Sequence, residues 1–162
     1  KQPEGIVGAT LRGGSIERVR GDSEIVGDRQ VGQQSAPLRH NGDAGPRFEM
    51  WSHNDPVTLY GAAMAGSGWD EVGAVFEHIA QRFSNCTSCE WEVVAADASD
   101  TLAYIVAIER TTTSVGGSEP SPYALRSTTI FRREDGAWKP VHRHADPFDD
   151  RATPLLAGLT SP

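Results

Sequence analysis

The second half of the sequence holds two residue pairs whose types and spacing could support redox or metal chemistry. Cys86 and Cys89 have the Cys-x-x-Cys spacing of a redox pair. They follow a predicted helix instead of opening one, so they lack the helix amides that lower the pKa of a thiol. The chain has two cysteines in all, and a second Cys-x-x-Cys that would complete a zinc site is missing. We therefore expect free or adventitiously bridged cysteines.

His142 and His144 form the second pair. Residues two apart on a strand project to the same side, so these histidines have the spacing of metal ligands. A catalytic zinc also needs a third ligand and an open position, and the candidates for that ligand are Glu109 and Asp146. A network of hydrogen-bonded histidines and a carboxylate is the alternative, and we favour it. We expect neither a metal nor a cofactor.

A third candidate is the turn that contains His53 and Asp55, between a short predicted helix and a short predicted strand. A histidine and a carboxylate this close could act as acid and base in a proton transfer. The alternative is an ordinary solvated turn. The sequence alone leaves both interpretations open.

The composition indicates one soluble domain of mixed structure. The chain has 162 residues, is 38% hydrophobic and 23% charged, and carries a formal net charge of -7. Its 15 basic residues are scattered, whereas nucleic acids and anionic membranes require clustered Lys and Arg. No run approaches 18 consecutive apolar residues, so no membrane-spanning segment is predicted. Two cysteines are too few for a disulfide scaffold, which makes the reducing cytoplasm the expected location.

Hydrophobic periodicity predicts the elements that must position these side chains. Steps of three and four from Trp69 to Phe83 indicate a helix, and Pro46 opens a shorter one that ends near Trp51. From Glu90 onward the period is two, which is typical of strands. The predicted strands cover residues 57–60, 91–97, 101–112, 123–133 and 137–145. The last four would form an antiparallel meander.

Residues 46–146 are the predicted folded domain. Residues 1–45 hold nine of the 17 glycines and no aromatic residue, so we expect a poorly ordered or extended arm that could contribute part of a first helix. Residues 147–162 are expected to form a flexible tail. In the strand 101–112, alternate residues are apolar on both faces, and such a strand needs a cover on each side. We therefore expect a homodimer closed by the face that carries Ala103, Ile105, Ala107 and Ile130, with His142 and His144 nearby.

Four segments carry a resemblance to a known family. They are His40-Asn-Gly-Asp43, the stretch Trp51–Gly61 (WSHNDPVTLYG), the stretch Leu102–Arg110 (LAYIVAIER) and the stretch Arg126–Asp146 (RSTTIFRREDGAWKPVHRHAD). Together they resemble the nuclear transport factor 2-like superfamily, which includes SnoaL-like polyketide cyclases, ketosteroid isomerase and the kinase association domain. The resemblance implies an α+β fold, in which a curved antiparallel sheet wraps around helices to form a conical cavity. It also implies dimers packed through the outer sheet face.

The chain departs from the family pattern in several places. Gly27, Gly32 and Pro37 occupy the stretch where the family has a long helix lining the pocket, so the cone could be partly uncovered. The match to ketosteroid isomerase places its general base on Leu59, its tyrosine near Ser35 and its protonated acid near Thr129, none of which can do that work. The arginines of the association domain likewise fall on Val106, Thr129 and Ala145.

Strand parity, combined with the resemblance, predicts what lines the cavity. If Tyr104, Val106 and Ile108 face inward, Arg143 is the one strong cation among apolar neighbours. It could anchor an anionic ligand oxygen, or it could form a structural ion pair with Asp55, Asp97 or Asp146. The candidate catalytic residues are Asp55, His53, Tyr104 and Arg143. The candidate ligand-binding residues are Trp51, Tyr60, Trp69, Phe76, Val106, Leu125, Ser127, Thr129, Val141 and Arg143, although the tryptophans also fit a plain core.

Two functions remain open at the level of the sequence. One is a SnoaL-like enzyme of secondary metabolism, which would cyclise, dehydrate or isomerise an aromatic or polyketide-like molecule by acid/base chemistry. The other is a non-catalytic ligand-binding or dimeric assembly module. An enzyme should bring at least two polar side chains within hydrogen-bond reach inside the cavity, whereas a binder needs one or none.

Overall fold

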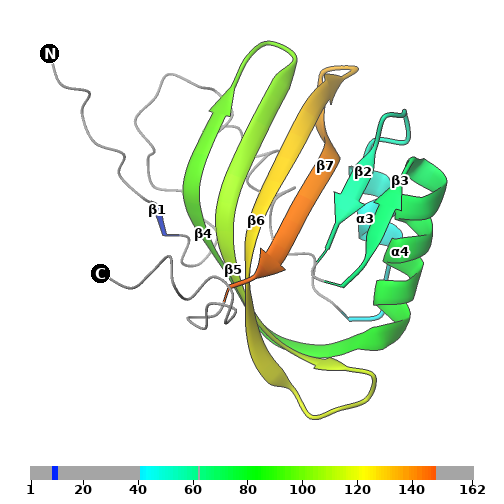
Figure 1. The fold of residues 1–162 in the computed structure, drawn as a ribbon, viewed down its shortest axis with the longest axis vertical. Coiled ribbons are helices and arrows are strands. Elements are labelled where there is room, and N and C mark those ends of the chain that lie inside the picture. Colours follow the sequence, from blue (N-terminus) through cyan, green and yellow to red (C-terminus); the bar gives the residue numbers. More distant parts are fainter. Residues whose placement is uncertain (1–8, 11–40, 62, 149–162) are drawn as a thin grey trace, which may run out of the picture.

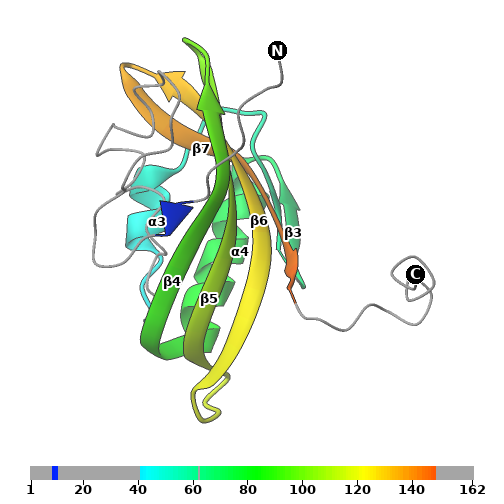
Figure 2. The ribbon, with the colours of Figure 1, turned by 90° about the vertical axis from the view of Figure 1, so that its left-hand side faces the viewer.

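The central feature of the fold is an antiparallel meander of four long strands, which the periodicity of the second half predicts. The computed structural model describes residues 9–10, 41–61 and 63–148. The meander consists of β4 (Phe83–Ala98), β5 (Leu102–Val115), β6 (Ser121–Glu134) and β7 (Ala137–Pro147). Strands that follow one another in this meander pair antiparallel along almost their full length. Figure 1 shows them side by side, and Figure 2 shows how strongly they curve.

Three short strands extend this sheet. On one side β7 pairs in parallel with β2 (Thr58–Tyr60), which in turn pairs antiparallel with β3 (Ala65–Ser67). On the other side β1 (Ala9–Thr10) pairs antiparallel with β4. Across the described residues the strand order is β1-β4-β5-β6-β7-β2-β3. The periodicity does not predict β3, because a three-residue strand of Ala, Gly and Ser has no hydrophobic alternation.

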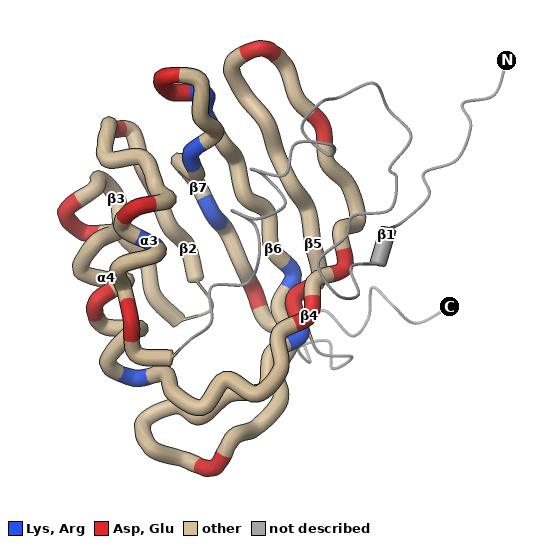
Figure 3. Tube along the Cα trace, turned by 180° about the vertical axis from the view of Figure 1, so that it is seen from behind, with Lys and Arg blue, Asp and Glu red and all other residues tan. Residues whose placement is uncertain are grey.

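Within the described residues, two helices lie on the concave side of the curved sheet, α3 (Gly45–Met50) and α4 (Trp69–Arg82). The apolar stripe of α4 turns Val72, Val75 and Phe76 inward, while acidic residues occupy its outside (Figure 3). Figure 2 shows the long strands curving around α4. The α+β architecture expected from the sequence is therefore confirmed, with the sheet wrapped around helices.

The buried apolar residues form two clusters. The first lies between the helices and the β2–β7 side of the sheet, and contains Trp51, Val57, Leu59, Val72, Val75 and Phe76. The second lies on the long strands, and contains Trp91, Val93, Ala103, Ile105, Ala107, Phe131 and Trp138. The space between the helices and the sheet that these clusters leave open is where the site is found.

The parity expected for β5 is wrong. Ala103, Ile105 and Ala107 belong to the buried core, and Tyr104 on the opposite face is 40% exposed. The register pairs Ile105 with Thr129, so the odd-numbered residues of β5 share the concave face with those of β6. Alternation cannot identify the inner face of this strand, because both faces are apolar. The face that carries Ala103, Ile105 and Ala107 therefore points into the protein and is not available for dimerisation.

The domain limits predicted from the sequence fall partly outside the described residues. This applies to most of the arm 1–45 and to the tail from residue 149 onward.

Of the helices in the described part, none is long and apolar enough to cross a membrane. In Figure 3 the basic residues of the described part are few and scattered. They do not form a continuous positive surface.

Candidate functional site

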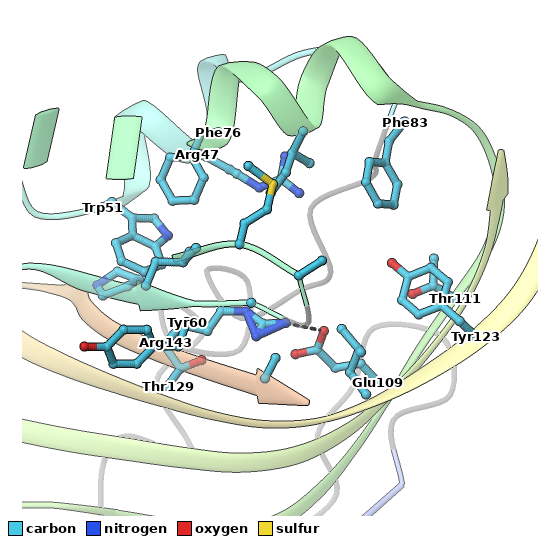
Figure 4. Close-up of a pocket in the computed structure, with 18 of the residues that line it drawn as sticks. Arg47, Trp51, Tyr60, Phe76, Phe83, Glu109, Thr111, Tyr123, Thr129 and Arg143 are labelled. Carbon is cyan, nitrogen blue, oxygen red and sulfur yellow. Dashed lines mark hydrogen bonds and ion pairs between the residues drawn. The ribbon is translucent and has the colours of Figure 1, made fainter. Parts of the chain in front are cut away.

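A cavity of about 440 Å³ lies between the helices and the concave face of the sheet. It is of the size that small-molecule sites commonly have. Its apolar lining comes from every layer of the fold, including Met50, Trp51, Leu59, Met64, Phe76, Ile79, Phe83, Trp91, Leu125, Phe131 and Ala145. Its polar lining side chains include Arg47, Glu109, Thr111, Tyr123, Thr129 and Arg143 (Figure 4).

An ion pair between β5 and β7 lies on the sheet side of the cavity. The Arg143 guanidinium donates from Nη2 to Glu109 Oε2 over 2.8 Å, and the Ser127 hydroxyl donates to Glu109 Oε1 over 2.6 Å. Glu109 is 8% exposed, and the Arg143 side chain keeps 23% of its surface. The two donors fix the position of the Glu109 carboxylate. Burial strengthens both interactions, because it weakens screening by solvent. Three polar side chains therefore converge within hydrogen-bond reach.

Arg47 of α3 adds a second cation from the helix side. It is 6% exposed, and its guanidinium lies over the Phe76 ring, 5.9 Å from the ring centroid. Burial lowers the pKa of Arg47 to about 10, and the nearby charge of Arg143 acts in the same direction. The described lining of the cavity therefore contains two guanidinium groups, Arg47 and Arg143, and one carboxyl group, Glu109.

A separate polar group lies at the end of the cavity near Phe83 (Figure 4). Thr111 and Tyr123 are direct partners across β5 and β6, and both line the cavity. Cys89 Sγ lies 3.6 Å from Thr111 Oγ1. Burial raises the pKa of the Tyr123 hydroxyl and raises the pKa of the Cys89 thiol to about 11. Both groups are therefore neutral at physiological pH.

Two buried side-chain nitrogens in the described part of the chain have no hydrogen-bond partner. They are Arg143 Nη1 and Trp91 Nε1, and both belong to residues that line the cavity. Leaving a buried donor unpaired costs about 1–3 kcal/mol. Unpaired donors at one cavity indicate a place where acceptor oxygens of a ligand would be stabilised.

The structure brings some of the predicted ligand-binding residues together at this cavity. Trp51, Tyr60, Phe76, Leu125, Thr129 and Arg143 line it. The ring of Tyr60 itself packs edge-on against His142 and His144 of the outer sheet face, with centroid distances of 5.9 and 6.0 Å. Ser127 contributes through Glu109 instead of through the lining.

Other predicted residues lie elsewhere. Tyr104 and Val106 are on the outer sheet face, because the parity of β5 is the reverse of the one expected. Val141 is buried beside the irregular pairing of β6 and β7, where the register shifts at Ile130 and Phe131, and does not line the cavity. Trp69 packs against the rings of Phe48, Phe76 and His53 outside the cavity.

The proposed acid/base pair of the turn is used for structure. His53 stacks on Trp69 with 3.8 Å between centroids, and its Nε2 lies 2.7 Å from the Phe48 carbonyl oxygen. The Asp55 carboxylate accepts a hydrogen bond from the Trp69 backbone N–H over 3.0 Å. Asp55 therefore caps the first turn of α4. Neither residue lines the cavity.

The partner of Arg143 also differs from the candidates named in the sequence. Asp146 pairs with Arg126, and Asp97 accepts the N–H of Ala98 in its own turn. Glu109 takes their place, although the parity argument assigns it to the outer face beside the histidines. The signal that identifies it is an acidic residue at the end of the apolar series Ala103, Ile105, Ala107. Arg47 and Thr111 had no comparable signal, because Arg47 lies in a six-residue helix and Thr111 lies on β5, whose parity is the reverse of the one expected.

The outer-face histidines contact neutral groups. His142 Nδ1 lies 2.7 Å from the Thr58 hydroxyl, and burial lowers the pKa of His142, with the neighbouring His144 acting in the same direction. In the part of the chain that the structure describes, no three His, Cys, Asp or Glu side chains are grouped so that they could hold a metal ion.

Comparison with known proteins agrees with this geometry. Residues 30–148 match the SnoaL-like domain family, and the chain belongs to this family. No curated protein matches the sequence significantly. The fold places it among nuclear transport factor 2-like proteins, as the resemblance implies.

Three solved structures illustrate this likeness. A nuclear transport factor 2-like superfamily protein from Salmonella enterica superposes with a TM-score of 0.61 at 9% identity, covering 75% of this chain and 89% of that one. A candidate dehydratase of the same family from Streptomyces avermitilis gives 0.59 at 20% identity, covering 74% and 94%. A ketosteroid isomerase-like protein from Erwinia carotovora gives 0.57 at 16% identity, covering 67% and 83%. At these identities the likeness concerns the fold.

Proposed function

We propose that the protein is an acid/base enzyme of the SnoaL-like type, which binds a small, largely apolar molecule in its cavity through an acidic or strongly polarised oxygen. The observation that carries this proposal is the Glu109–Arg143 pair, with Ser127 behind it, in a cavity whose walls are mostly apolar. A binder needs one polar contact or none, whereas this site brings two lining side chains, Glu109 and Arg143, within hydrogen-bond reach.

The chemistry follows from the charges of the pair. Arg143 stabilises negative charge on a ligand oxygen, because a guanidinium in a low-dielectric site attracts an anionic oxygen more strongly than it would in water. The Glu109 carboxyl group is the base that would take a proton from a carbon next to a polarised carbonyl group, and Arg143 would stabilise the resulting enolate. Cyclisation, dehydration and isomerisation of carbonyl compounds all include this step.

Binding is tested by comparing 2-naphthoate with its neutral amide. Their dissociation constants are measured by tryptophan fluorescence, since Trp51 and Trp91 line the cavity. We expect the parent to prefer the acid, and Arg143→Met, which keeps much of the side-chain volume, to lose this preference while remaining folded. Equal binding of acid and amide by both proteins would show that Arg143 does not anchor the ligand.

Catalysis is tested separately, with the ketone 2-tetralone in deuterated water. We expect the parent to accelerate the exchange of the protons next to the carbonyl, and Glu109→Gln to abolish the acceleration. Binding without any acceleration in the parent would favour the alternative function, a non-catalytic ligand-binding module. The control variant is Glu92→Gln, which changes an exposed carboxylate on the outside of β4.

The outer face of the sheet supports a second proposal, that the protein forms a homodimer. Tyr104, Val106, Ile108 and Ile130 lie together at the centre of this face through the register of β5 and β6. Exposed ion pairs flank them, Glu92 with Arg110 and Arg126 with Asp146. An apolar centre with a polar rim is typical of an interface between subunits. The interface therefore uses the opposite face of β5 from the one that the sequence predicts.

A further inference from the structure

The Thr111–Tyr123 pair has no role in the acid/base chemistry, although it lines the same cavity as Glu109 and Arg143. Figure 4 shows it at the end of the cavity near Phe83, well away from Trp51 and Phe76. Thr111 is 4% exposed, its hydroxyl lies 3.6 Å from Cys89 Sγ, and Tyr123 is its direct partner on β6. The pair is therefore a built group and not a solvated surface feature.

The spacing of this pair from the acid/base site is set by β5. Thr111 is two residues beyond Glu109, so both side chains project to the concave face about 7 Å apart along the strand. Tyr123 lies directly opposite Thr111 on β6, and Leu125 lies opposite Glu109. The cavity floor thus offers two polar points with an apolar surface between them. Two oxygens at opposite ends of a fused two-ring molecule have a comparable separation.

The two polar points differ in chemistry. The first combines a carboxylate with a guanidinium, and suits an acidic oxygen. The second consists of neutral hydroxyls, since burial raises the pKa of Tyr123. Each hydroxyl has one hydrogen to donate, and both oxygens can accept a hydrogen bond. Such a pair suits a neutral hydroxyl or carbonyl group of a ligand, and not a second anion.

We propose that Tyr123 and Thr111 form a second ligand-binding subsite, which recognises a neutral hydroxyl or carbonyl group at the far end of a ligand whose acidic oxygen is held by Arg143. The ligand class is then a flat, largely apolar molecule of about two fused rings, with an acidic oxygen at one end and a neutral oxygen at the other. This inference rests on the proposed function, because it takes the position of Arg143 as the first anchor.

The test compares 2-naphthoate with 6-hydroxy-2-naphthoate, which differ only in the hydroxyl at the far end. We expect the parent to bind the hydroxylated acid about tenfold more tightly, the usual magnitude for one hydrogen bond in a dry site. Tyr123→Phe should bring the two acids to equal affinity and leave the affinity for 2-naphthoate within about twofold. Tyr104→Phe is the matched control on the outer face, and should keep the tenfold preference.

Thr111→Val provides a second test if Tyr123→Phe does not fold, as judged by circular dichroism. It keeps the side-chain shape, removes one hydroxyl and should also reduce the preference. An equal affinity of the parent for both acids, or a preference that survives in both variants, would overturn the subsite while leaving acid binding at Arg143 intact. If neither acid binds to the parent, the proposed function fails first, and the subsite fails with it.

Discussion

At the scale of single residues, Glu109 and a bound ligand would compete for the guanidinium group of Arg143. Arg143 donates from Nη2 to Glu109 Oε2 over 2.8 Å, and its Nη1 has no hydrogen-bond partner. An anionic ligand at Arg143 gains from the guanidinium and is repelled by the carboxylate beside it. Arg143 can therefore pair either with Glu109 or with an anionic oxygen of a ligand.

The first prediction removes that competition. In Glu109→Gln the repelling charge is gone while the shape is kept, so 2-naphthoate should bind about threefold to tenfold more tightly than in the parent. Isothermal titration calorimetry measures the change, with the neutral amide as the control that should not gain. An unchanged or weaker affinity for the acid would mean that Glu109 does not face the bound anion.

The inward direction of Arg143 could be predicted from the sequence, but its partner could not. Alternation along β7 and the resemblance together place Arg143 with Ala145 on the concave face, and both residues line the cavity. The inward position of Glu109 could not be predicted, because β5 has apolar residues on both faces. Which face of β5 points inward is decided by its pairing with β6 and not by its own sequence. The position of Arg47 depends on how α3 packs, which local patterns do not contain.

At the scale of elements, the start of α4 depends on a residue from a distant turn. Its N-cap residue is Gly68, which has no side chain to cap the helix, and the Asp55 carboxylate accepts the Trp69 N–H instead. The periodicity of the sequence correctly predicts a helix that begins at Trp69. It does not predict that Asp55 caps this helix.

The second prediction follows from this capping. Asp55→Ala should lower the free energy of unfolding by about 1 kcal/mol, since one backbone donor of the first turn loses its acceptor. Urea unfolding measures the change. The affinity for 2-naphthoate should stay as in the parent, because Asp55 lies outside the cavity. A large loss of binding or of proton exchange with normal stability would return Asp55 to the catalytic candidates.

The junction of β2 and β7 gives the third prediction, which concerns pH. Burial lowers the pKa of His142 below its ordinary value of about 6.5, and His144 adds to the shift. The side chains around it are neutral: the Thr58 hydroxyl, the Tyr60 ring and, across from it on β6, Ile130. The folded protein therefore favours the neutral imidazole, whose Nδ1 can accept the Thr58 hydroxyl hydrogen.

The sign of the pH dependence follows. Below about pH 6.5 the unfolded chain binds a proton at this histidine that the folded protein binds less readily, so the His142 contribution to stability is complete above that pH and declines as the pH falls. Thermal unfolding from pH 7.5 to 5 should show a smaller loss of stability in His142→Gln than in the parent. Identical pH profiles of the two proteins would contradict the shift.

At the scale of the whole molecule, the helices of the described residues cover one face of the curved sheet and leave the other uncovered. The resemblance implies dimers through the outer face, and we propose that Tyr104, Val106, Ile108 and Ile130, which the register of β5 and β6 brings together, form the centre of the interface. The fourth prediction is that Ile108→Asp converts a dimer to a monomer without unfolding it, as measured by sedimentation. Ile105→Ala, on the buried face, should instead destabilise each subunit by about 2–4 kcal/mol. A monomeric parent at micromolar concentration would contradict the dimer.

Binding of a small apolar acid in the cavity between the helices and the sheet can be observed directly. The chain has two methionines, Met50 and Met64, and both line this cavity. Methyl-labelled methionine therefore gives two NMR signals that report on the cavity from α3 and from the loop before β3. We predict that titration with 2-naphthoate shifts both signals along one saturating curve, with nuclear Overhauser effects between the methyl groups and the naphthyl protons. Saturation of the protein, as seen by calorimetry, without any change at either methyl group would contradict the account.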